Sequence, residues 1–425
     1  MSEVLNNHMA KRRFFIVFCL FIGIAIAYVD RVNVSLLAAN DPFLIEMGIK
    51  SQPVQIGMMM SIFLIAYGLA NVILGPLGDV IGPRKMMTIC VAVMLVSVMV
   101  SSIATIFMVL LIGRAILGVG EGAYYPQQSL FIRNWIPVKE RGLANGLWTV
   151  GQGVAPALSM PILAYIISQW GWRANFYCCI LLTIIPLALF WFCTTDRPRQ
   201  DKRMSQAELD YIEAGMEKTD NAVVEQEKLP LLQRWKIMSV NAHYWVLVIW
   251  YMCLQFMGWG LATWMPVYLK MAKGFSWAEM GWMASLPFVL SIFARFAGGV
   301  LSDKIGHCAP ILFAAMLVGT VSLYGSIVIP GKYISAVCLA LGYGGVTLGT
   351  PAAWTLLQSG LVSSKVLSTA GGAMNGIANG FSALSPIIIG FFISAMGNYN
   401  SGIYCLIVSG VIGIATGSIL VLKKY

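Results

Sequence analysis

The sequence predicts an all-α membrane protein in which twelve transmembrane helices form two pseudo-symmetric six-helix halves. Hydrophobic residues make up 58% of the 425 residues and charged residues only 11%, too few charges to cover a water-soluble domain of this length. Apolar stretches of about 20 residues, the length of a helix that crosses a bilayer, recur along the chain. A motif that follows the second stretch returns in the second half of the chain.

Polar breaks between the apolar stretches define the twelve predicted spans. The first half holds residues 14–39, 54–78, 86–106, 107–132, 143–168 and 174–194. The second half holds residues 244–269, 280–302, 309–330, 333–358, 367–395 and 401–422. No water satisfies backbone polar groups inside a bilayer, so each span is expected to be a helix that forms its own hydrogen bonds.

These spans divide the chain into five segments. They are a cytoplasmic N-terminal tail (1–13), a first six-helix half (14–194), a cytoplasmic central loop (195–243), a second six-helix half (244–422) and a cytoplasmic C-terminal tail (423–425). The central loop contains Ser205 and, three residues later, Glu208, a spacing typical of a capping box. We therefore expect a short helix from Ser205 to about Lys218, in a loop that connects the halves.

The distribution of basic residues predicts the orientation of the spans. If both termini lie in the cytoplasm, the basic residues on the other side are Lys50, Arg173, Lys270, Lys273 and Lys332. Those within spans are Arg31, Arg114 and Arg295, and all others lie in cytoplasmic tails and loops. This bias follows the positive-inside rule, so the net charge of +10 indicates topology and not a nucleic-acid partner. We expect a monomeric, multi-pass protein of the inner (plasma) membrane, surrounded by lipid.

Cysteines and histidines do not have the spacing of metal ligands. Most of the nine cysteines lie inside apolar runs, where a thiol acts as a small packing group. His8, His243 and His307 are far apart in the sequence. We expect no metal, no disulfide and no cofactor, with protons as the only coupling ion. The sequence contains no nucleophile–base arrangement and no cofactor loop, so we expect no catalytic residues and no enzyme.

An internal repeat follows the second and eighth spans. Residues 75–82 and residues 299–306 both read G-x-L-x-D-x-x-G. Two tandem sets of six spans in parallel orientation are typical of secondary transporters whose halves rock around a central site. The motif aspartates lie at cytoplasmic helix ends, where a carboxylate accepts bonds from helix N-termini and basic side chains. We therefore predict a cytoplasmic gate formed by Asp79, Arg84, Asp303 and Lys304.

Five charged residues lie well inside spans: Asp30, Arg31, Arg114, Glu121 and Arg295. Burying a charge at bilayer depth costs at least about 2.5–3.5 kcal/mol, so such residues usually mark a transport pathway. Arg114 and Glu121 are seven residues apart and lie on nearly the same face of one helix. A buried carboxyl such as Glu121 is suited to carry a proton, because its charge state depends on nearby arginines and anions.

Asp30 and Arg31 place an acid and a base side by side on the first span. Their side chains point about 100° apart and therefore face different partners. Arg31 offers planar, bidentate recognition of a carboxylate or phosphate. Asp30 is either a second proton site or the counter-ion that holds Arg31 or Arg114 in place.

The repeat and its loop motif resemble the major facilitator superfamily over essentially the whole chain, which implies that superfamily's fold. Val80 stands where the motif usually has a basic residue, so the first copy is imperfect. Residues 28–33 (Y-x-D-R-x-N), the R-x6-E pair on the fourth span and residues 263–269 (TWMPVYL) resemble the anion:cation symporter family. That family includes proton-coupled carriers of sugar acids such as galactonate.

The narrower resemblance implies roles for individual residues. It implies proton coupling at Asp30 and Glu121. It implies a substrate cavity lined by Arg31, Arg114, Tyr67 and Gln152 in the first half, and by Trp354, Thr355 and Asn375 in the second. Arg295 departs from the sugar-acid members, where an apolar residue is expected. Arg295 has three interpretations: it binds a second acidic group, extends the gate network with Asp303, or reaches the cytoplasmic surface. Its position eight residues before Asp303 favours the last of these.

These patterns favour a secondary transporter that imports a small organic anion, such as an aldonate, hexonate or related carboxylate, by proton symport. An organophosphate:phosphate antiporter is an alternative, because paired arginines also suit phosphate. A symporter of an aromatic carboxylic acid is another, because Tyr124 and Tyr125 lie close to Glu121. A drug:proton antiporter is disfavoured by a short glycine–proline pattern on the fifth span. A sensor would need an output domain for which no segment is long enough.

Overall fold

The computed structural model describes residues 12–75, 77–216, 231–363 and 366–425, and this part of the chain contains helices but no strand. Twelve helical segments within it are long and apolar enough to cross a membrane. This result confirms the predicted fold class. The fifth span, Arg141–Trp170, and the eleventh, Thr369–Met396, are each formed by two consecutive helices.

The first half contains six spans and their short connections. The spans are α2 (Arg12–Leu37), α4 (Pro53–Leu74), α6 (Pro83–Ser102), α7 (Phe107–Trp135), α8 with α9 (Arg141–Thr149 and Gly151–Trp170) and α10 (Trp172–Cys193). The connections include α3 (Asp41–Glu46), α5 (Leu77–Ile81) and η1 (Val138–Glu140). Tight packing of α4 on α7 requires glycine, because an added Cβ at Gly118 or Gly122 would lie 2.3 or 2.2 Å from a backbone oxygen of α4.

The second half repeats this arrangement after the central loop. Its spans are α14 with the π-helical turn η3 (Ala242–Val267 and Tyr268–Ala272), α15 (Trp277–Ile305), α16 (Ala309–Val328), α17 (Lys332–Leu356), α18 with α19 (Leu367–Ser382 and Ser385–Met396) and α20 (Asn400–Leu422). A second π-helical turn, η4 (Leu357–Leu361), follows α17. The side chain of Ser276 caps α15, and Gly306, at a φ of +70°, ends it, as left-handed glycines commonly do.

The central loop forms η2 (Pro198–Gln200), α11 (Gln206–Met216) and α13 (Leu231–Ser239). The predicted helix is present, and the Ser205 hydroxyl accepts a bond from the Glu208 backbone N–H at 3.3 Å. The capping-box prediction is wrong in its second half. The Glu208 carboxylate instead accepts bonds from the backbone N–H groups of Arg12 and Arg13 at 3.0 and 3.1 Å. It therefore caps α2, whose first amides have no partner within the helix.

Further charges hold α11 against the start of α2. Arg13 pairs with Glu208 at 3.0 Å and with Glu140 at 2.8 Å, and the Tyr211 hydroxyl donates to Glu140 at 2.8 Å. Burial raises the pKa of Glu140, but the bonds from Arg13 and Tyr211 outweigh burial and hold the pKa below its usual value. The part of the central loop that contains α11 thus belongs structurally to the first half.

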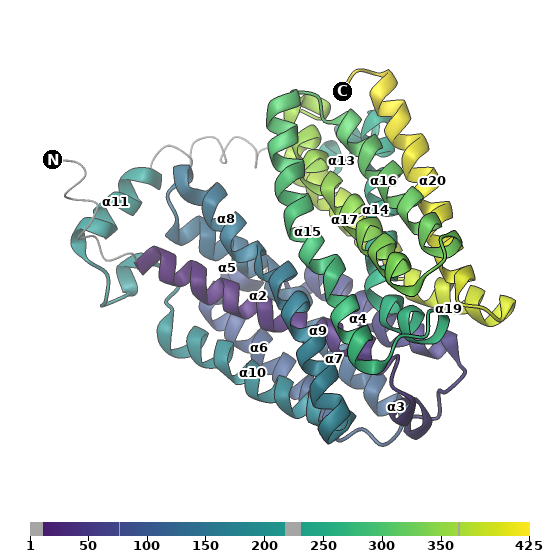
Figure 1. Cartoon of the computed structure of the whole chain (residues 1–425). Helices are drawn as coiled ribbons and strands as arrows, with labels where there is room; N and C mark the ends of the chain where they lie inside the picture. The colour runs from purple at the N-terminus through teal and green to yellow at the C-terminus, as the bar shows by residue number, and fades with distance from the viewer. Residues whose placement is uncertain (1–11, 76, 217–230, 364–365) are drawn as a thin grey trace.

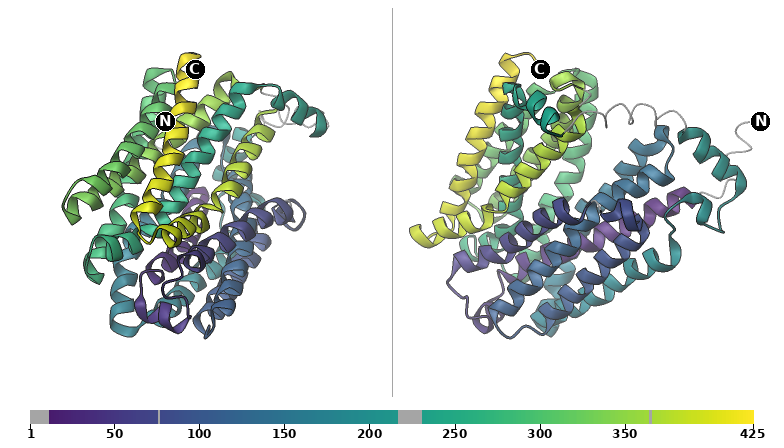
Figure 2. Two further views of the ribbon diagram at one scale, coloured as in Figure 1. Left: turned by 90° about the vertical axis from the view of Figure 1, so that its right-hand side faces the viewer. Right: turned by 180° about the vertical axis from the view of Figure 1, so that it is seen from behind.

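The two halves meet at one end of the molecule and diverge toward the other (Figures 1 and 2). We call the diverging end, which carries α11 and the C-terminus, the terminal end, and the end that carries α3 the opposite end. Between the halves, α9 packs on α15 and α4 packs on α19. An added Cβ at Gly57 would lie 2.2 Å from the Pro386 carbonyl oxygen, and one at Gly390 would lie 2.4 Å from that of Pro53. Glycine therefore lets α4 and α19 touch.

Polar contacts also join the halves at the opposite end. The Lys270 ammonium donates to the Ala39 carbonyl at 2.7 Å and to the Asp41 carboxylate at 2.8 Å. The Trp277 indole donates to the Ala164 carbonyl at 2.7 Å. The hydrogen bond from Lys270 lowers the pKa of Asp41, and burial opposes this only in part. These bonds, together with the glycine contacts, close the opposite end.

Candidate functional site

A buried ion pair lies at the centre of the first half. The Arg31 guanidinium on α2 donates from Nε to the Glu121 carboxylate on α7. Arg31 is 4% exposed and Glu121 is 1% exposed. The second Glu121 oxygen, Oε1, is buried and has no hydrogen-bond partner among the described residues. The predicted proton carrier and the predicted anion binder therefore neutralise each other in this conformation.

Aromatic rings enclose the Arg31 guanidinium. Its central carbon lies 4.4 Å from the ring centroid of Tyr28, 4.9 Å from that of Tyr67 and 5.5 Å from that of Trp259, distances at which rings attract cations. Trp259 comes from α14, so the second half completes the enclosure. Tyr67 was predicted as a cavity residue; Tyr28 and Trp259 were not. Tyr28 precedes Arg31 by three residues, a spacing that places both on one helix face.

Arg114 makes different contacts from those predicted. Its side chain donates to two backbone carbonyls, those of Met59 on α4 and Asp30 on α2, each at 3.1 Å. It is 2% exposed, and no carboxylate lies within ion-pair distance of it among the described residues. Arg114 thus ties α2 and α4 to α7, while its charge acts on nearby Glu121.

The Asp30 carboxylate bonds to α10 and interacts electrostatically with Arg114. Its Oδ2 accepts a bond from the Thr183 hydroxyl on α10 at 3.3 Å, and Oδ1 is buried without a partner among the described residues. The described part of the chain contains no ion pair of Asp30 with Arg31 or Arg114. Because Asp30 and Arg114 still act on each other electrostatically, both predicted roles of Asp30, proton site and counter-ion, stay predictions. Thr183 was not predicted, because only the fold brings α10 beside α2.

Two tyrosines on α7 have separate surroundings. Tyr124 is buried, and its ring packs edge-on against Phe190 of α10 at a centroid distance of 6.1 Å. Tyr125 packs on Trp148 at 5.5 Å and interacts with Gln152, a predicted cavity residue. Tyr125 also acts on Tyr67 electrostatically. Tyr124 is thus a packing residue of the first half, whereas Tyr125 belongs to the group of side chains around Arg31.

A cavity of about 300 Å³ lies in the second half, between α17, η4 and α18. Its lining consists of Trp354, Leu357, Gln358, Leu367, Gly371, Gly372 and Asn375. The structure therefore brings Trp354 and Asn375 together as predicted, whereas Thr355 is half-buried and does not line this cavity. The Asn379 amide donates to the Asn375 side chain at 3.0 Å and accepts a bond from Gln255 at 3.0 Å. This amide chain was not predicted, although Asn375 and Asn379 are one helical turn apart.

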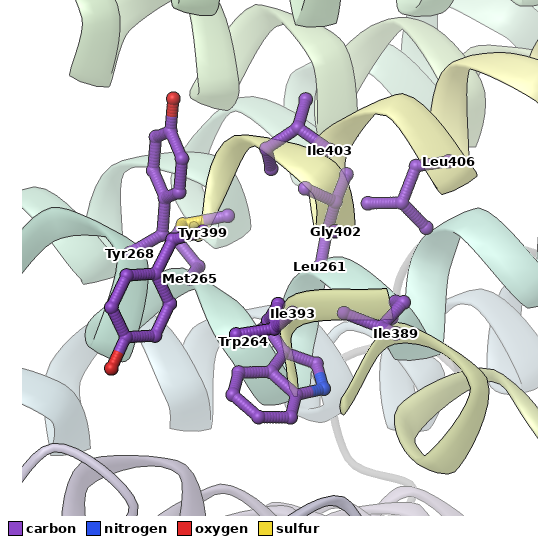
Figure 3. A pocket seen from close by; sticks show the side chains of 11 residues that line it. Leu261, Trp264, Met265, Tyr268, Ile389, Ile393, Tyr399, Gly402, Ile403 and Leu406 are labelled. Atoms are coloured by element: carbon purple, nitrogen blue, oxygen red, sulfur yellow. The ribbon is translucent and has the colours of Figure 1, made fainter. Parts of the chain in front are cut away.

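A second pocket lies between α14, α19 and α20 (Figure 3). Its lining is mostly aliphatic and aromatic, and includes Leu261, Ile389, Ile403 and Leu406. Its volume of about 10 Å³ is at or below the roughly 10–15 Å³ that a single water molecule needs. We interpret it as a packing gap and not as a binding site.

Arg295 as a whole is only partly buried. Its Nε on α15 is buried and has no hydrogen-bond partner among the described residues. Its guanidinium acts electrostatically on Tyr251 of α14 and on Tyr343 of α17. Arg295 therefore points toward two neighbouring helices of the second half.

The predicted gate residues lie at the terminal end, where the halves are apart. The Arg84 backbone N–H donates to the Asp196 carboxylate at 2.8 Å, and its side chain donates to the Trp191 carbonyl at 2.5 Å, both within the first half. Lys304 is exposed. The side chains of Asp79 and Asp303 lie outside the described residues. Within the described part of the chain, no ion pair joins the halves at this end.

Comparisons with known proteins agree with this architecture. The sequence matches the Major Facilitator Superfamily over residues 13–387. A probable sulfoacetate transporter of Cupriavidus necator is 28% identical over 391 residues, which cover 88% of this chain and 86% of that protein. A probable galactarate/D-glucarate transporter of Bacillus subtilis is 26% identical over 406 residues, which cover 92% and 88%. The D-galactonate transporter of Escherichia coli is 27% identical over 400 residues, which cover 91% and 90%.

Solved structures show the same fold. A bacterial homologue of the human lysosomal transporter Spinster, in an inward-facing and unoccupied conformation, superposes with a TM-score of 0.75 at 18% identity, covering 98% of this chain and 96% of that chain. A D-xylose–proton symporter gives a TM-score of 0.72 at 16% identity, covering 96% and 97%. The curated relatives are named as transporters, which confirms that the protein is not an enzyme. The chain belongs to the Major Facilitator Superfamily and is a membrane transporter of that superfamily.

Proposed function

We propose that the protein imports a small organic anion, such as a sugar acid, together with protons across the plasma membrane. The relatives reported above are named as a probable sulfoacetate transporter, a probable galactarate/D-glucarate transporter and a D-galactonate transporter, and all of these substrates are small organic acids. Five charged groups at bilayer depth, four of them in the first half, support a pathway for anions and protons.

The observation that carries the proposal is the Arg31–Glu121 pair. While Glu121 is ionised, it occupies the guanidinium that would otherwise bind a substrate carboxylate. A proton that enters at Glu121 removes the carboxylate charge and frees Arg31 for the incoming anion, which replaces one negative charge by another. Binding of the anion and binding of the proton therefore favour each other, and this coupling is reciprocal.

Neighbouring residues have supporting roles in the proposal. Asp30, fully buried beside the Thr183 hydroxyl, is a second proton site. Substrate hydroxyls bind Tyr67 and Gln152 from the first half. Trp354, Thr355 and Asn375 shape the second half of the cavity. Arg114 fixes the distance between α2 and α7 through the carbonyls that it bonds, and its charge adds to the attraction for an anion.

Transport proceeds by alternating access in this proposal. The positive-inside rule predicts that the terminal end, which carries α11 and the C-terminus, faces the cytoplasm. Contact between the halves at the opposite end, through Gly57 and Lys270, then corresponds to an inward-facing state. When the halves rock, this end opens and the terminal end closes, which brings Asp79, Arg84, Asp303 and Lys304 into one gate.

Transport in proteoliposomes tests the proposal. With acidic buffer outside, the wild type is expected to concentrate D-galactonate or a related sugar acid against its gradient. Glu121→Gln keeps the carboxyl shape but not its titration, so it is expected to exchange substrate without concentrating it. Glu213→Gln is the matched control, because Glu213 is paired with Arg199 on the surface of α11, far from the site.

Two outcomes would contradict the proposal. Concentrative uptake by Glu121→Gln would remove Glu121 from proton coupling. Uptake by the wild type that does not respond to the proton gradient would exclude proton symport.

A further inference from the structure

Arg295 is a partly buried cation without a described acceptor. Arg31 donates to a carboxylate and Arg114 to two carbonyls, whereas the enclosed Nε of Arg295 has no hydrogen-bond partner among the described residues. An unsatisfied donor of a charged group costs more free energy than a neutral one. The enclosed Nε lacks an acceptor while the side chain as a whole is partly exposed, so an acceptor from outside the protein can reach it.

The surroundings of Arg295 contain rings and hydroxyls. Tyr251 and Tyr343 lie within its electrostatic range. Tyr343 packs on Phe288 at 5.3 Å, and Tyr251 packs edge-on against Trp354 at 6.1 Å. No carboxylate is paired with Arg295 in the described part of the chain. Phenol hydroxyls donate hydrogen bonds as well as accept them, so a guanidinium between two tyrosines suits an anion.

These side chains connect Arg295 to both parts of the site already described. Trp354, which contacts Tyr251, lines the 300 Å³ cavity of the second half. Tyr28, which stacks on Arg31 at 4.4 Å, also acts electrostatically on Tyr251 and Tyr343. Tyr251 and Tyr343 are therefore within electrostatic range of Arg295 on α15 and of Tyr28, the ring that contacts Arg31 on α2.

The charges of the two guanidiniums differ in their compensation. Glu121 neutralises Arg31, whereas nothing in the described part of the chain neutralises Arg295. Protonation of Glu121 would leave two positive groups, one in each half. One acidic group on the substrate would compensate only one of them.

We propose that Arg295 binds a second acidic group of the transported anion, so that the preferred substrates carry an acidic group at each end. The class comprises short dicarboxylates, such as aldarates, and compounds with one carboxylate and one sulfonate. This inference depends on the proposed function, since it assumes that Arg31 binds the first acidic group. It assigns selectivity between one-acid and two-acid substrates to a single residue of the second half.

Galactarate and D-galactonate form a matched pair of probes, because both have a six-carbon chain. Galactarate has a carboxylate at both ends of this chain, and D-galactonate has one at one end only. Affinities are measured by calorimetry on purified wild type, Arg295→Gln and Arg295→Lys. Removal of a hydrogen bond between charged groups is expected to weaken galactarate binding by about 10- to 100-fold. Galactonate binding should change by less than about twofold, and Arg295→Lys should recover part of the galactarate affinity because the charge is kept.

Controls separate a lost contact from a damaged protein. Arg199→Gln makes the same substitution at an exposed position of the central loop and should leave both affinities unchanged. A melting curve in detergent reports whether Arg295→Gln is folded. If Arg295→Gln is unfolded, the affinities are measured on Tyr343→Phe instead. That change removes only a hydroxyl near Arg295 and should also weaken the binding of galactarate selectively.

The outcomes distinguish this inference from the proposed function. Equal loss of affinity for both probes, or no loss for either, would overturn the role of Arg295. A wild type that binds galactonate well and galactarate poorly would overturn the two-acid class but leave sugar-acid transport standing. A wild type that binds neither probe would overturn the sugar-acid substrate of the proposed function, and this inference with it.

Discussion

In the first half, Arg31 is paired with Glu121, enclosed by aromatic rings and surrounded by further buried charges, whereas Arg295 in the second half has tyrosines around it and no described acceptor. The second half otherwise offers amides and an indole around its cavity. Addition of one proton to Glu121 converts the Arg31–Glu121 pair from a neutral pair to a single positive charge. Arg295 has no paired carboxylate in the described part of the chain, so a proton has no such effect there. Under the proposed function, this difference places the proton-dependent switch in the first half and substrate selection in the second.

The largest expected effect comes from breaking the buried pair. Arg31→Ala leaves the Glu121 carboxylate buried and unpaired, which should cost about 3–5 kcal/mol of stability and abolish anion binding. Arg31→Met combined with Glu121→Met removes both charges and should recover most of the stability but no binding. Unfolding and calorimetry measure both effects. A single Arg31→Ala variant as stable as the wild type would show that the pair is not buried as described.

A smaller effect is expected at Arg114, which donates to two backbone carbonyls and also contacts the Met60 sulfur and the Phe63 ring. Arg114→Ala removes bonds to Met59 and Asp30 and should cost about 1–3 kcal/mol of stability, with a weaker loss of anion affinity than at Arg31. Melting curves and binding isotherms on the same preparation compare the two losses. A stable Arg114→Ala variant without affinity would instead make Arg114 a direct ligand of the substrate.

The contact between the halves is sensitive to volume at Gly57. A methyl group there would meet the Pro386 carbonyl oxygen, so Gly57→Ala should shift the protein away from the conformation closed at the opposite end. We expect a change of about tenfold in the equilibrium, which corresponds to about 1.4 kcal/mol. Spin labels on α4 and α19 report the distance distribution. Gly68→Ala on the same helix is the control, because nothing lies within 4 Å of its added Cβ.

The smallest effect is expected at the Asp41–Lys270 bond, since both side chains are partly exposed. Asp41→Asn should weaken closure of the opposite end by less than about 1 kcal/mol. The folded pKa of Asp41 is lowered, so the contribution is complete above the ordinary aspartate pKa of about 3.9 and is lost as the pH falls through the lowered value. The same spin labels, followed over acidic pH, check this dependence. Closure that strengthens on acidification would contradict it.

Much of the architecture follows from local sequence. The spans are predicted by three features of the sequence alone: the length of the apolar stretches, the repeat around Asp79 and Asp303, and the positions of the basic residues. The approximate ends of α11 were also predicted. The partner of Glu208 was not, because the bare N-terminus of α2 that it caps is distant in sequence.

Many residues of the candidate site could be predicted from the sequence, but the contacts between them could not. Spacing along α7 directed attention to Arg114 and Glu121, but the ion pair joins Glu121 to Arg31 on α2. Such contacts between spans depend on how the helices are rotated and how closely they approach. Gly118 and Gly122 set that approach between α4 and α7. Spacing also favoured a surface position for Arg295, which is partly exposed, but it did not predict that Arg295 acts electrostatically on Tyr251 and Tyr343.

Proton uptake on substrate binding is the most direct test of the central claim that a proton at Glu121 releases Arg31 for the anion. Purified protein in weakly buffered solution with a pH indicator is mixed with D-galactonate or galactarate. The account predicts that the wild type takes up protons as the anion binds and that Glu121→Gln binds the anion with reduced proton uptake or none. Anion binding without proton uptake in the wild type, or unchanged uptake in Glu121→Gln, would contradict it.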